Sequence, residues 1–328
     1  MAKKDLLTER IVYKPFEYPE AHDYWLKQQQ AHWIHTEVPM MSDVNDWKQN
    51  LTKTEKNIIG SILKGFAQTE TVVNDYWTGL VTKWFRKPEI IAMATTFGAM
   101  ETIHAEAYSL LNEELGLDDF SEFLEDEATM AKIETLMDVR DSFNGEIDWH
   151  ERAKSLAIFS AFTEGVNLFS SFAVLLSFKM RNKLKGVGQI VEWSIRDESM
   201  HSDAGCWLFR TLLLEHPELN TPELEAAINE AALLSLKLEL DFIEKVYEYG
   251  DLEGCNKDDL IHFIKNRVNT KLGDLGYKPI VDNVDMTAVD RMKWFDHLSA
   301  GKQHTDFFAS RVTNYSKGHI EWDAAAIF

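Results

Sequence analysis

The stretches Glu101-Thr-Ile-His104 and Glu198-Ser-Met-His201 decide how this sequence folds. Residues three apart share one face of an α-helix, so each stretch can present a carboxylate and an imidazole to a common point. Each stretch lies in a segment with helical apolar spacing, and this favours two helices that face each other across a shared core. The two stretches therefore predict a polar site inside a helical protein.

Two further glutamates repeat the pattern. Glu70 lies in the mostly apolar stretch Phe-Ala-Gln-Thr-Glu-Thr-Val-Val, 31 residues before Glu101, and Glu164 lies in a similar stretch 34 residues before Glu198. A carboxylate buried without a partner is severely unfavourable. The order is therefore Glu on one helix, Glu-x-x-His on the next, and then the same again, which is the ligand set of helical bundles that bind two metal ions.

The six residues suit a pair of divalent first-row metal ions. Four carboxylates neutralise two dications, and oxygen and nitrogen donors also accept higher oxidation states. The alternative is a buried network of structural salt bridges among the same groups. The predicted metal ligands are Glu70, Glu101, His104, Glu164, Glu198 and His201.

A third acidic-x-x-His pair is interpreted as a coincidence. Roughly one or two such pairs are expected by chance among 54 acidic residues and 11 histidines in 328. Asp259 and His262 lie near an expected helix start, without the apolar surroundings of the other two pairs. Asp259 is interpreted instead as a solvated acid in a first helical turn.

Helix signals extend along the chain and predict an all-α fold. Thr52 and Glu55 form a capping box, and Pro88 suits a first helical turn. Strand-like alternation is nearly absent. The expected helices cover residues 52 to about 84, a stretch from Pro88 that Gly116 follows, residues 150–183, a further helix to about Glu215, and residues 221–249 and 257–272, with Gly186 and Gly188 breaking the helix over 150–183.

Composition excludes several classes of function. The net charge of -20 argues against a nucleic-acid partner, which requires a basic surface. The sequence has no apolar run of 18 residues and no signal peptide, so we expect no membrane span. Only Cys206 and Cys255 are present, which excludes a disulfide framework and fits the cytoplasm.

Glu101-Thr-Ile-His-Ala-Glu-Ala-Tyr108 and Ile195-Arg-Asp-Glu-Ser-Met-His201 resemble the metal-binding helices of class I ribonucleotide reductase small subunits. The resemblance extends from about Trp33 to the C-terminus and includes the order and spacing of all six ligands. It implies a ferritin-like helical bundle whose metal pair generates and stores a one-electron oxidant. The oxidant passes to a separate large subunit, which reduces ribonucleotides to deoxyribonucleotides. The resemblance also implies a homodimer.

The resemblance assigns roles to four more residues. Tyr108 matches the radical-bearing tyrosine, and Trp33 matches the tryptophan that relays the electron near the metals. Asp197 matches the aspartate that links a ligand histidine to this tryptophan. Tyr315 matches the tyrosine that hands the radical to the large subunit. Residues 1–310 would form the ferritin-like domain, and residues 311–328 a flexible tail that binds the large subunit.

Two features of the resemblance point to different oxidants. Many family members have aspartate at the first ligand position, whereas this sequence has Glu70. Glutamate there is typical of subclasses that use manganese, alone or with iron, and hold the oxidant on the metals. Tyr108 instead favours a tyrosyl radical. We expect manganese in the cluster (Mn/Mn or Mn/Fe), with Fe/Fe as the alternative.

Other functions use the same ligand set. A ferritin-like dinuclear-metal oxidase acting without a large subunit would share all six ligands but would not need Tyr315. A storage or monooxygenase bundle would not need Trp33, Asp197 and the tail together. A helical scaffold without enzymatic activity would have no reason to bury four carboxylates.

Overall fold

The computed structural model describes residues 4–117, 130–131, 134–135, 137 and 148–299. The described residues form helices joined by loops and contain no β-strand, which confirms the expected all-α fold. None of these helices combines the length and apolar character that a membrane span requires. The α-helices are α1 (Pro19–Ala31), α2 (Met41–Gln49), α3 (Lys53–Asp75), α4 (Thr82–Trp84), α5 (Pro88–Leu115), α7 (Trp149–Ile158), α8 (Phe169–Met180), α9 (Lys185–Glu215), α10 (Pro222–Glu248), α11 (Lys257–Leu275), α12 (Met286–Arg291) and α13 (Lys293–Ser299). Short 3₁₀ turns are η1 (His35–Glu37) and η5 (Pro217–Leu219), and π-helical turns are η2 (Tyr76–Val81) and η4 (Phe159–Thr163).

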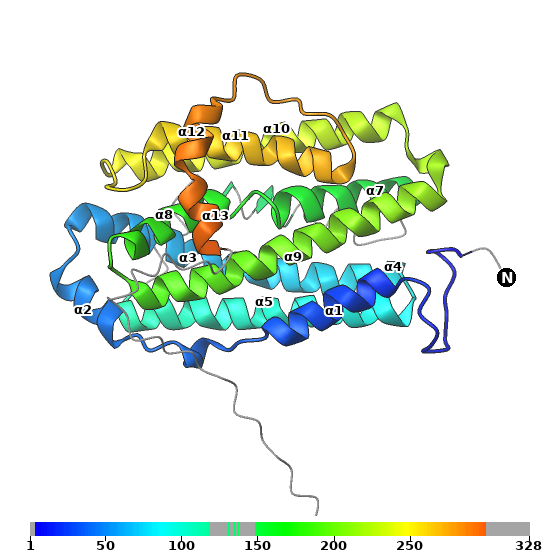
Figure 1. Cartoon of the computed structure of the whole chain (residues 1–328), viewed down its shortest axis with the longest axis horizontal. Helices are drawn as coiled ribbons and strands as arrows, with labels where there is room; N and C mark the ends of the chain where they lie inside the picture. Colours follow the sequence, from blue (N-terminus) through cyan, green and yellow to red (C-terminus); the bar gives the residue numbers. More distant parts are fainter. Residues whose placement is uncertain (1–3, 118–129, 132–133, 136, 138–147, 300–328) are drawn as a thin grey trace, which may run out of the picture.

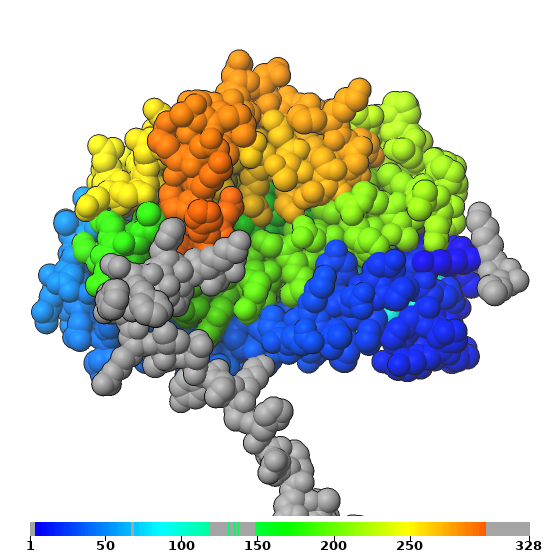
Figure 2. All heavy atoms as spheres, viewed as in Figure 1, coloured from blue at the N-terminus to red at the C-terminus, as the bar shows by residue number. Residues whose placement is uncertain are grey.

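The long helices form a layered bundle (Figure 1). Helix α5 packs against α3 on one side and against α1 on another, while α9 contacts α5, α7 and α8. Helices α10 and α11 form an upper layer, and α12 and α13 descend from it toward α8 and α9. In the space-filling view, α1 (blue) and α12–α13 (orange) cover the bundle from opposite edges of the same face (Figure 2). The site described below lies among α3, α5 and α9.

The start of α3 and both ends of α5 follow the sequence signals, whereas α3 ends at Asp75 and the stretch expected to reach about residue 84 continues as the π-helical turn η2 and α4. The Thr52 hydroxyl accepts a hydrogen bond from the Glu55 backbone N–H, and the Glu55 carboxylate accepts one from the Thr52 N–H, so the capping box forms. Helix α5 begins at Pro88 and ends before Gly116, whose φ of 70° is the left-handed conformation of a helix stop. These two helices carry three of the predicted ligands.

The single helix expected over residues 150–183 is wrong. The chain forms α7, the π-helical turn η4, a turn over residues 164–168, and then α8. The break releases the backbone carbonyl of Gly165, which accepts a hydrogen bond from Arg267 on α11. Apolar periodicity could not reveal this break because its hydrogen-bond partner lies about a hundred residues away in the sequence.

The predicted role of Gly186 and Gly188 as helix breakers is also wrong. The break comes earlier, where Asn182 and Leu184 have φ angles of 63° and 48°. Both glycines lie inside the first turns of α9. Gly186 instead permits close packing, because a Cβ atom there would lie 2.7 Å from the Met40 sulfur.

Helix α2, which the sequence did not reveal, supplies the N-terminal cap of α9. The fully buried Asp43 carboxylate accepts hydrogen bonds from the backbone N–H groups of Gly186 and Val187, at 3.0 and 2.8 Å. These donors have no partner within the helix, and the positive end of the helix dipole favours an anion. Asp43 therefore fixes the start of the helix that carries Glu198 and His201.

We predict that Asp43→Ala lowers the free energy of unfolding by about 1–3 kcal/mol, because it leaves two buried N–H groups without partners. Urea denaturation followed by circular dichroism measures the change. Asp23→Ala, at an exposed position on α1, is the control and should change stability by less than about 0.5 kcal/mol. Equal effects of the two substitutions would contradict the capping role.

Candidate metal centre

The six predicted ligands come together in two overlapping groups. The first position comprises Glu70, Glu101, His104 and Glu198, and the second comprises Glu101, Glu164, Glu198 and His201. Within each group, one donor atom per residue lies within 4.8 Å of every other. Glu101 and Glu198 belong to both groups. Two adjacent positions with four donors each and two shared carboxylates are the arrangement that a pair of metal ions needs.

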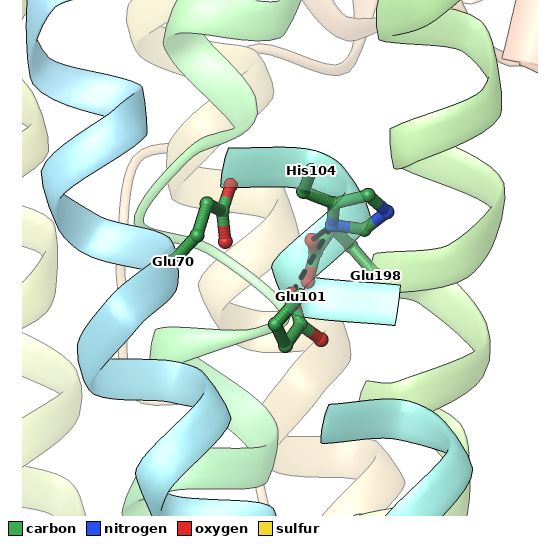
Figure 3. Close-up of side chains that lie close together, drawn as sticks. All are labelled: Glu70, Glu101, His104 and Glu198. Atoms are coloured by element: carbon green, nitrogen blue, oxygen red, sulfur yellow. Dashed lines mark hydrogen bonds and ion pairs between the residues drawn. The ribbon is translucent and has the colours of Figure 1, made fainter. Parts of the chain in front are cut away.

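Four separate segments bring these side chains together, and Figure 3 shows the first position. Glu70 extends from α3, Glu101 and His104 lie three residues apart on α5, and Glu198 approaches from α9. Glu164 follows the π-helical turn η4 directly. The second position therefore lies beside a π-helical turn. Such turns interrupt regular helix geometry and often occur at functional sites.

A close contact between α9 and η4 brings Glu164 and Glu198 to the same site. Gly205 packs directly onto Ser160, and a Cβ atom at Gly205 would collide with the serine side chain. Glycine is therefore required at this crossing, which lies one turn from the ligand His201.

The cluster has the chemistry of a metal site, and among the described residues its glutamates form ion pairs only with its own two histidines. All six side chains are at most 2 % exposed. Among the described residues, no lysine or arginine forms an ion pair with the four glutamates. The buried atoms of the cluster that make no hydrogen bond of normal geometry are both carboxylate oxygens of Glu70, one oxygen each of Glu101, Glu164 and Glu198, and Nδ1 of His201, although His201 Nδ1 lies within ion-pair distance of Glu101. Orphaned oxygens facing one another are costly unless cations lie between them, so these residues fit two metal ions.

The two histidines supply positive charge when metal is absent. Burial alone would raise the pKa of Glu101, but the charges of His201 and His104 outweigh it and lower that pKa to about 2. Burial alone would lower the pKa of His201, but Glu101 and Glu164 raise it to about 9. The pKa of His104 is likewise raised, chiefly by Glu101 and by hydrogen bonding to Asp197.

Burial and neighbouring charges favour the protonated form of two of the glutamates. Burial, together with the charge of Glu101, raises the pKa of Glu70 well above its usual value. Burial and the charges of Glu101 and Glu164 do the same for Glu198. These glutamates and histidines must lose their protons before they can all coordinate metal. Protons and metal ions therefore compete for the site.

Both imidazoles point Nδ1 into the cluster and Nε2 away from it. His104 Nδ1 lies 3.0 Å from a Glu198 oxygen, and His201 Nδ1 lies 2.7 Å from a Glu101 oxygen. On the outer side, His104 Nε2 lies 3.2 Å from Asp197. In both rings Nδ1 is therefore available to a metal ion, and Nε2 contacts a residue outside the predicted ligand set.

Asp197 connects the cluster to Trp33 through hydrogen bonds. The Trp33 indole N–H donates to Asp197 Oδ2 at 2.7 Å, the oxygen that His104 also contacts. The Trp33 ring stacks on His104 with centroids 5.6 Å apart and packs against Trp193 at 5.2 Å. Hydrogen bonding from His104 outweighs burial and lowers the pKa of Asp197, which therefore remains an anion.

Tyr108 is fully buried one turn beyond His104 on α5. Burial, and then the charge of Glu70, raises the pKa of Tyr108 well above its usual value, so the phenol is neutral. Its hydroxyl makes no hydrogen bond of normal geometry, and its ring packs on Phe66 at 4.7 Å. Tyr315 and the segment 311–328 lie outside the described residues.

The coincidental pair is separate from the cluster, but the interpretation of Asp259 as a solvated acid is wrong, because Asp259 is buried. Asp259 binds the Arg291 guanidinium through both carboxylate oxygens, and His262 Nδ1 accepts a hydrogen bond from the Asp285 backbone N–H. Through these contacts both side chains hold α12 against α11.

Sequence reasoning missed two residues that contact the ligands. The buried Trp77, in η2, donates its indole N–H to Glu164 Oε1 at 2.5 Å, which leaves the other oxygen of Glu164 without a partner. The buried Gln28, on α1, lies between Asp197 and His201. Neither residue belongs to a recognisable motif, and both reach the site only through the packing of segments distant in sequence.

We predict that the affinity for Mn²⁺ rises with pH up to about 9, because His201, whose pKa is raised to about 9, must release its proton when metal binds, as must any glutamate whose raised pKa keeps it protonated. Isothermal titration calorimetry in two buffers with different ionisation enthalpies counts these protons. Release of more than one proton per chain is expected, whereas an affinity independent of pH would contradict the protonation pattern.

Comparison with known proteins identifies the family. The family model described as ribonucleotide reductase, small chain, matches residues 10–284. A probable ribonucleoside-diphosphate reductase small subunit of Invertebrate iridescent virus 3 is 34% identical, over 97% of this chain and 87% of that protein. The ribonucleoside-diphosphate reductase subunit beta of Chlamydia pneumoniae is 25% identical, over 94% and 91%.

Solved structures share the fold. A putative class I ribonucleotide reductase from Bacillus halodurans superposes with a TM-score of 0.78 at 22% identity, over 85% of this chain and 99% of that one. The dimanganese(II)-NrdF structure of Streptococcus sanguinis gives a TM-score of 0.71 at 22% identity, over 87% and 99%. With this fold, a buried cluster for two metals and a family match over most of its length, the chain belongs to the ribonucleotide reductase small-chain family.

Proposed function

We propose that the six clustered residues bind two metal ions and that Asp197 and Trp33 carry the resulting oxidant out of the site. The chain acts as the small subunit of ribonucleoside-diphosphate reductase. When bound, the metal pair supplies a stored one-electron oxidant. The large subunit uses that oxidant to reduce ribonucleotides to deoxyribonucleotides.

The observation that carries this proposal is the unbroken contact from His104 through Asp197 to Trp33. An indole that loses one electron becomes a far stronger acid at its N–H group than the neutral indole. Asp197 Oδ2, 2.7 Å away and anionic, is placed to accept that proton, so the electron and the proton leave Trp33 together. Stacking of Trp33 on His104 keeps the indole in contact with the ligand set.

The same observation disfavours the ferritin-like oxidase that acts without a large subunit. Such an oxidase needs the six ligands but no route that leads an electron into the site from a second protein. A tryptophan that is buried to 2 % exposure and joined to a ligand histidine through one carboxylate is such a route. The reductase function therefore explains two residues that the oxidase would leave without a purpose.

We infer that the cluster contains manganese, as Mn/Mn or Mn/Fe, with Fe/Fe as the alternative. Glu70 is one methylene longer than the aspartate of many family members. Both of its oxygens are free of hydrogen bonds, so it can change from one binding mode to another. The Streptococcus sanguinis structure with the same fold is a dimanganese(II) protein.

The proposed function includes two protein partners, which are the large subunit and a second copy of this chain. The tail of residues 311–328 would bind the large subunit and Tyr315 would pass the radical across, with residues 1–310 forming the ferritin-like domain. Two copies of the chain would form a homodimer. Each proposal follows the family resemblance.

We predict that Trp33→Phe lowers ribonucleotide reduction by at least about a hundredfold while two metal ions per chain are retained, because phenylalanine has no N–H group and is much harder to oxidise. Reductase assays with the large subunit and metal analysis measure the two quantities. Trp47→Phe, a partly buried tryptophan on α2, is the control and should retain activity. Full activity of Trp33→Phe would contradict the relay.

We predict that Tyr108→Phe retains turnover when the chain is loaded with manganese and activated, because the oxidant then resides on the metals. Electron paramagnetic resonance measures this directly: a multiline manganese signal should decay during turnover in both proteins. A narrow organic-radical signal that disappears in Tyr108→Phe, together with lost activity, would instead identify Tyr108 as the radical site.

A further inference from the structure

Gln28 is the one fully buried glutamine side chain among the described residues that contacts the metal centre from outside the ligand set. It lies on α1, a helix that packs against both α5 and α9. Its amide nitrogen donates to Asp197 Oδ1 at 3.0 Å, and its amide oxygen lies 3.1 Å from His201 Nε2. One side chain therefore bridges the aspartate beside Trp33 and a predicted ligand of the second position.

The chemistry of the amide fixes the direction of both contacts. A carboxylate only accepts hydrogen bonds, so the group facing Asp197 must be the NH₂ of Gln28. The amide oxygen consequently faces His201 and, as an acceptor, requires a proton on His201 Nε2. When His201 is neutral, its lone pair must then be on Nδ1, the atom 2.7 Å from Glu101.

The two histidine ligands consequently have different partners. His104 Nε2 faces the carboxylate of Asp197, whereas His201 Nε2 faces the neutral amide of Gln28. A carboxylate partner raises the basicity of a ligand histidine more than an amide does. The first position should therefore favour a more oxidised ion than the second position.

We propose that Gln28 is a positioning residue that holds His201 with Nδ1 toward the second metal position and makes the two positions inequivalent. This inference rests on the proposed function, because it assumes that the cluster binds two metal ions. It adds a role for α1, the helix just before Trp33, in the affinity of one of those ions.

Two substitutions separate positioning from simple space-filling. Gln28→Met retains the length of the side chain but neither hydrogen bond. Gln28→Glu, when protonated, retains a donor for Asp197 and an acceptor oxygen for His201, so it mimics the amide. Gln30→Met, at an exposed position on the same helix, is the matched control.

The test is equilibrium binding of Mn²⁺, measured from the free-ion signal in electron paramagnetic resonance. We expect Gln28→Met to bind the first ion as the wild type does and the second about 10- to 100-fold more weakly. Gln28→Glu should restore the second affinity to within about threefold, and Gln30→Met should change neither. An unchanged second affinity in Gln28→Met, or equal weakening of both ions, would overturn the inference.

Neutron diffraction on metal-loaded wild-type crystals tests the same inference without any variant. Deuterium on His201 Nε2, with the Gln28 oxygen facing it, is the expected result, and deuterium on Nδ1 would overturn it. The outcomes also separate this inference from the proposed function. A wild-type chain that binds fewer than two ions refutes both, whereas two ions and an unaffected Gln28→Met refute only the role of Gln28.

Discussion

The structure depends on one electrostatic constraint, which is that four glutamates and only two histidines are buried together. Moving each charged side chain from water into the protein interior costs about several kcal/mol of free energy, and repulsion between neighbouring carboxylates adds to that cost. Without metal, protonation reduces the cost: the pKa values of Glu70 and Glu198 are raised, which favours their neutral forms, and the pKa values of both imidazoles are raised beside Glu101. Two dications would remove the cost more completely, because they satisfy the orphaned oxygens as well as the charge.

Contacts between the surrounding segments hold the six cluster residues in place despite the cost of burying their charges. Asp43 fixes the start of α9, and the glycine at Gly205 lets α9 approach the π-helical turn before Glu164. Outside the ligands, Asp197 and Trp77 each hold one ligand through a single hydrogen bond. The ligands are thus oriented by groups that bind no metal themselves, as the chemistry of a metal centre requires.

The sequence predicted which residues cluster better than it predicted the segments between them. Helical spacing of three residues places Glu101 beside His104 without any tertiary information, and the repeated order of Glu and Glu-x-x-His suffices to identify the set. The break at Gly165 depends on Arg267, and the cap of α9 depends on Asp43. Such partners are distant in sequence and carry no periodic signal, and the same is true of Gln28. The assignment of Trp33 and Asp197 required the family resemblance, because each alone has an ordinary structural interpretation.

An anomalous-difference map from crystals grown with Mn²⁺ tests the central claim, that this cluster is a site for two metal ions, most directly. We predict two peaks about 3.5–4 Å apart, one in each position, with Glu101 and Glu198 between them. Crystals of His201→Ala should lose the peak of the second position, whereas His262→Ala, from the acidic-x-x-His pair outside the cluster, should retain both. A single peak in the wild type, or two peaks that persist in His201→Ala, would contradict the assignment.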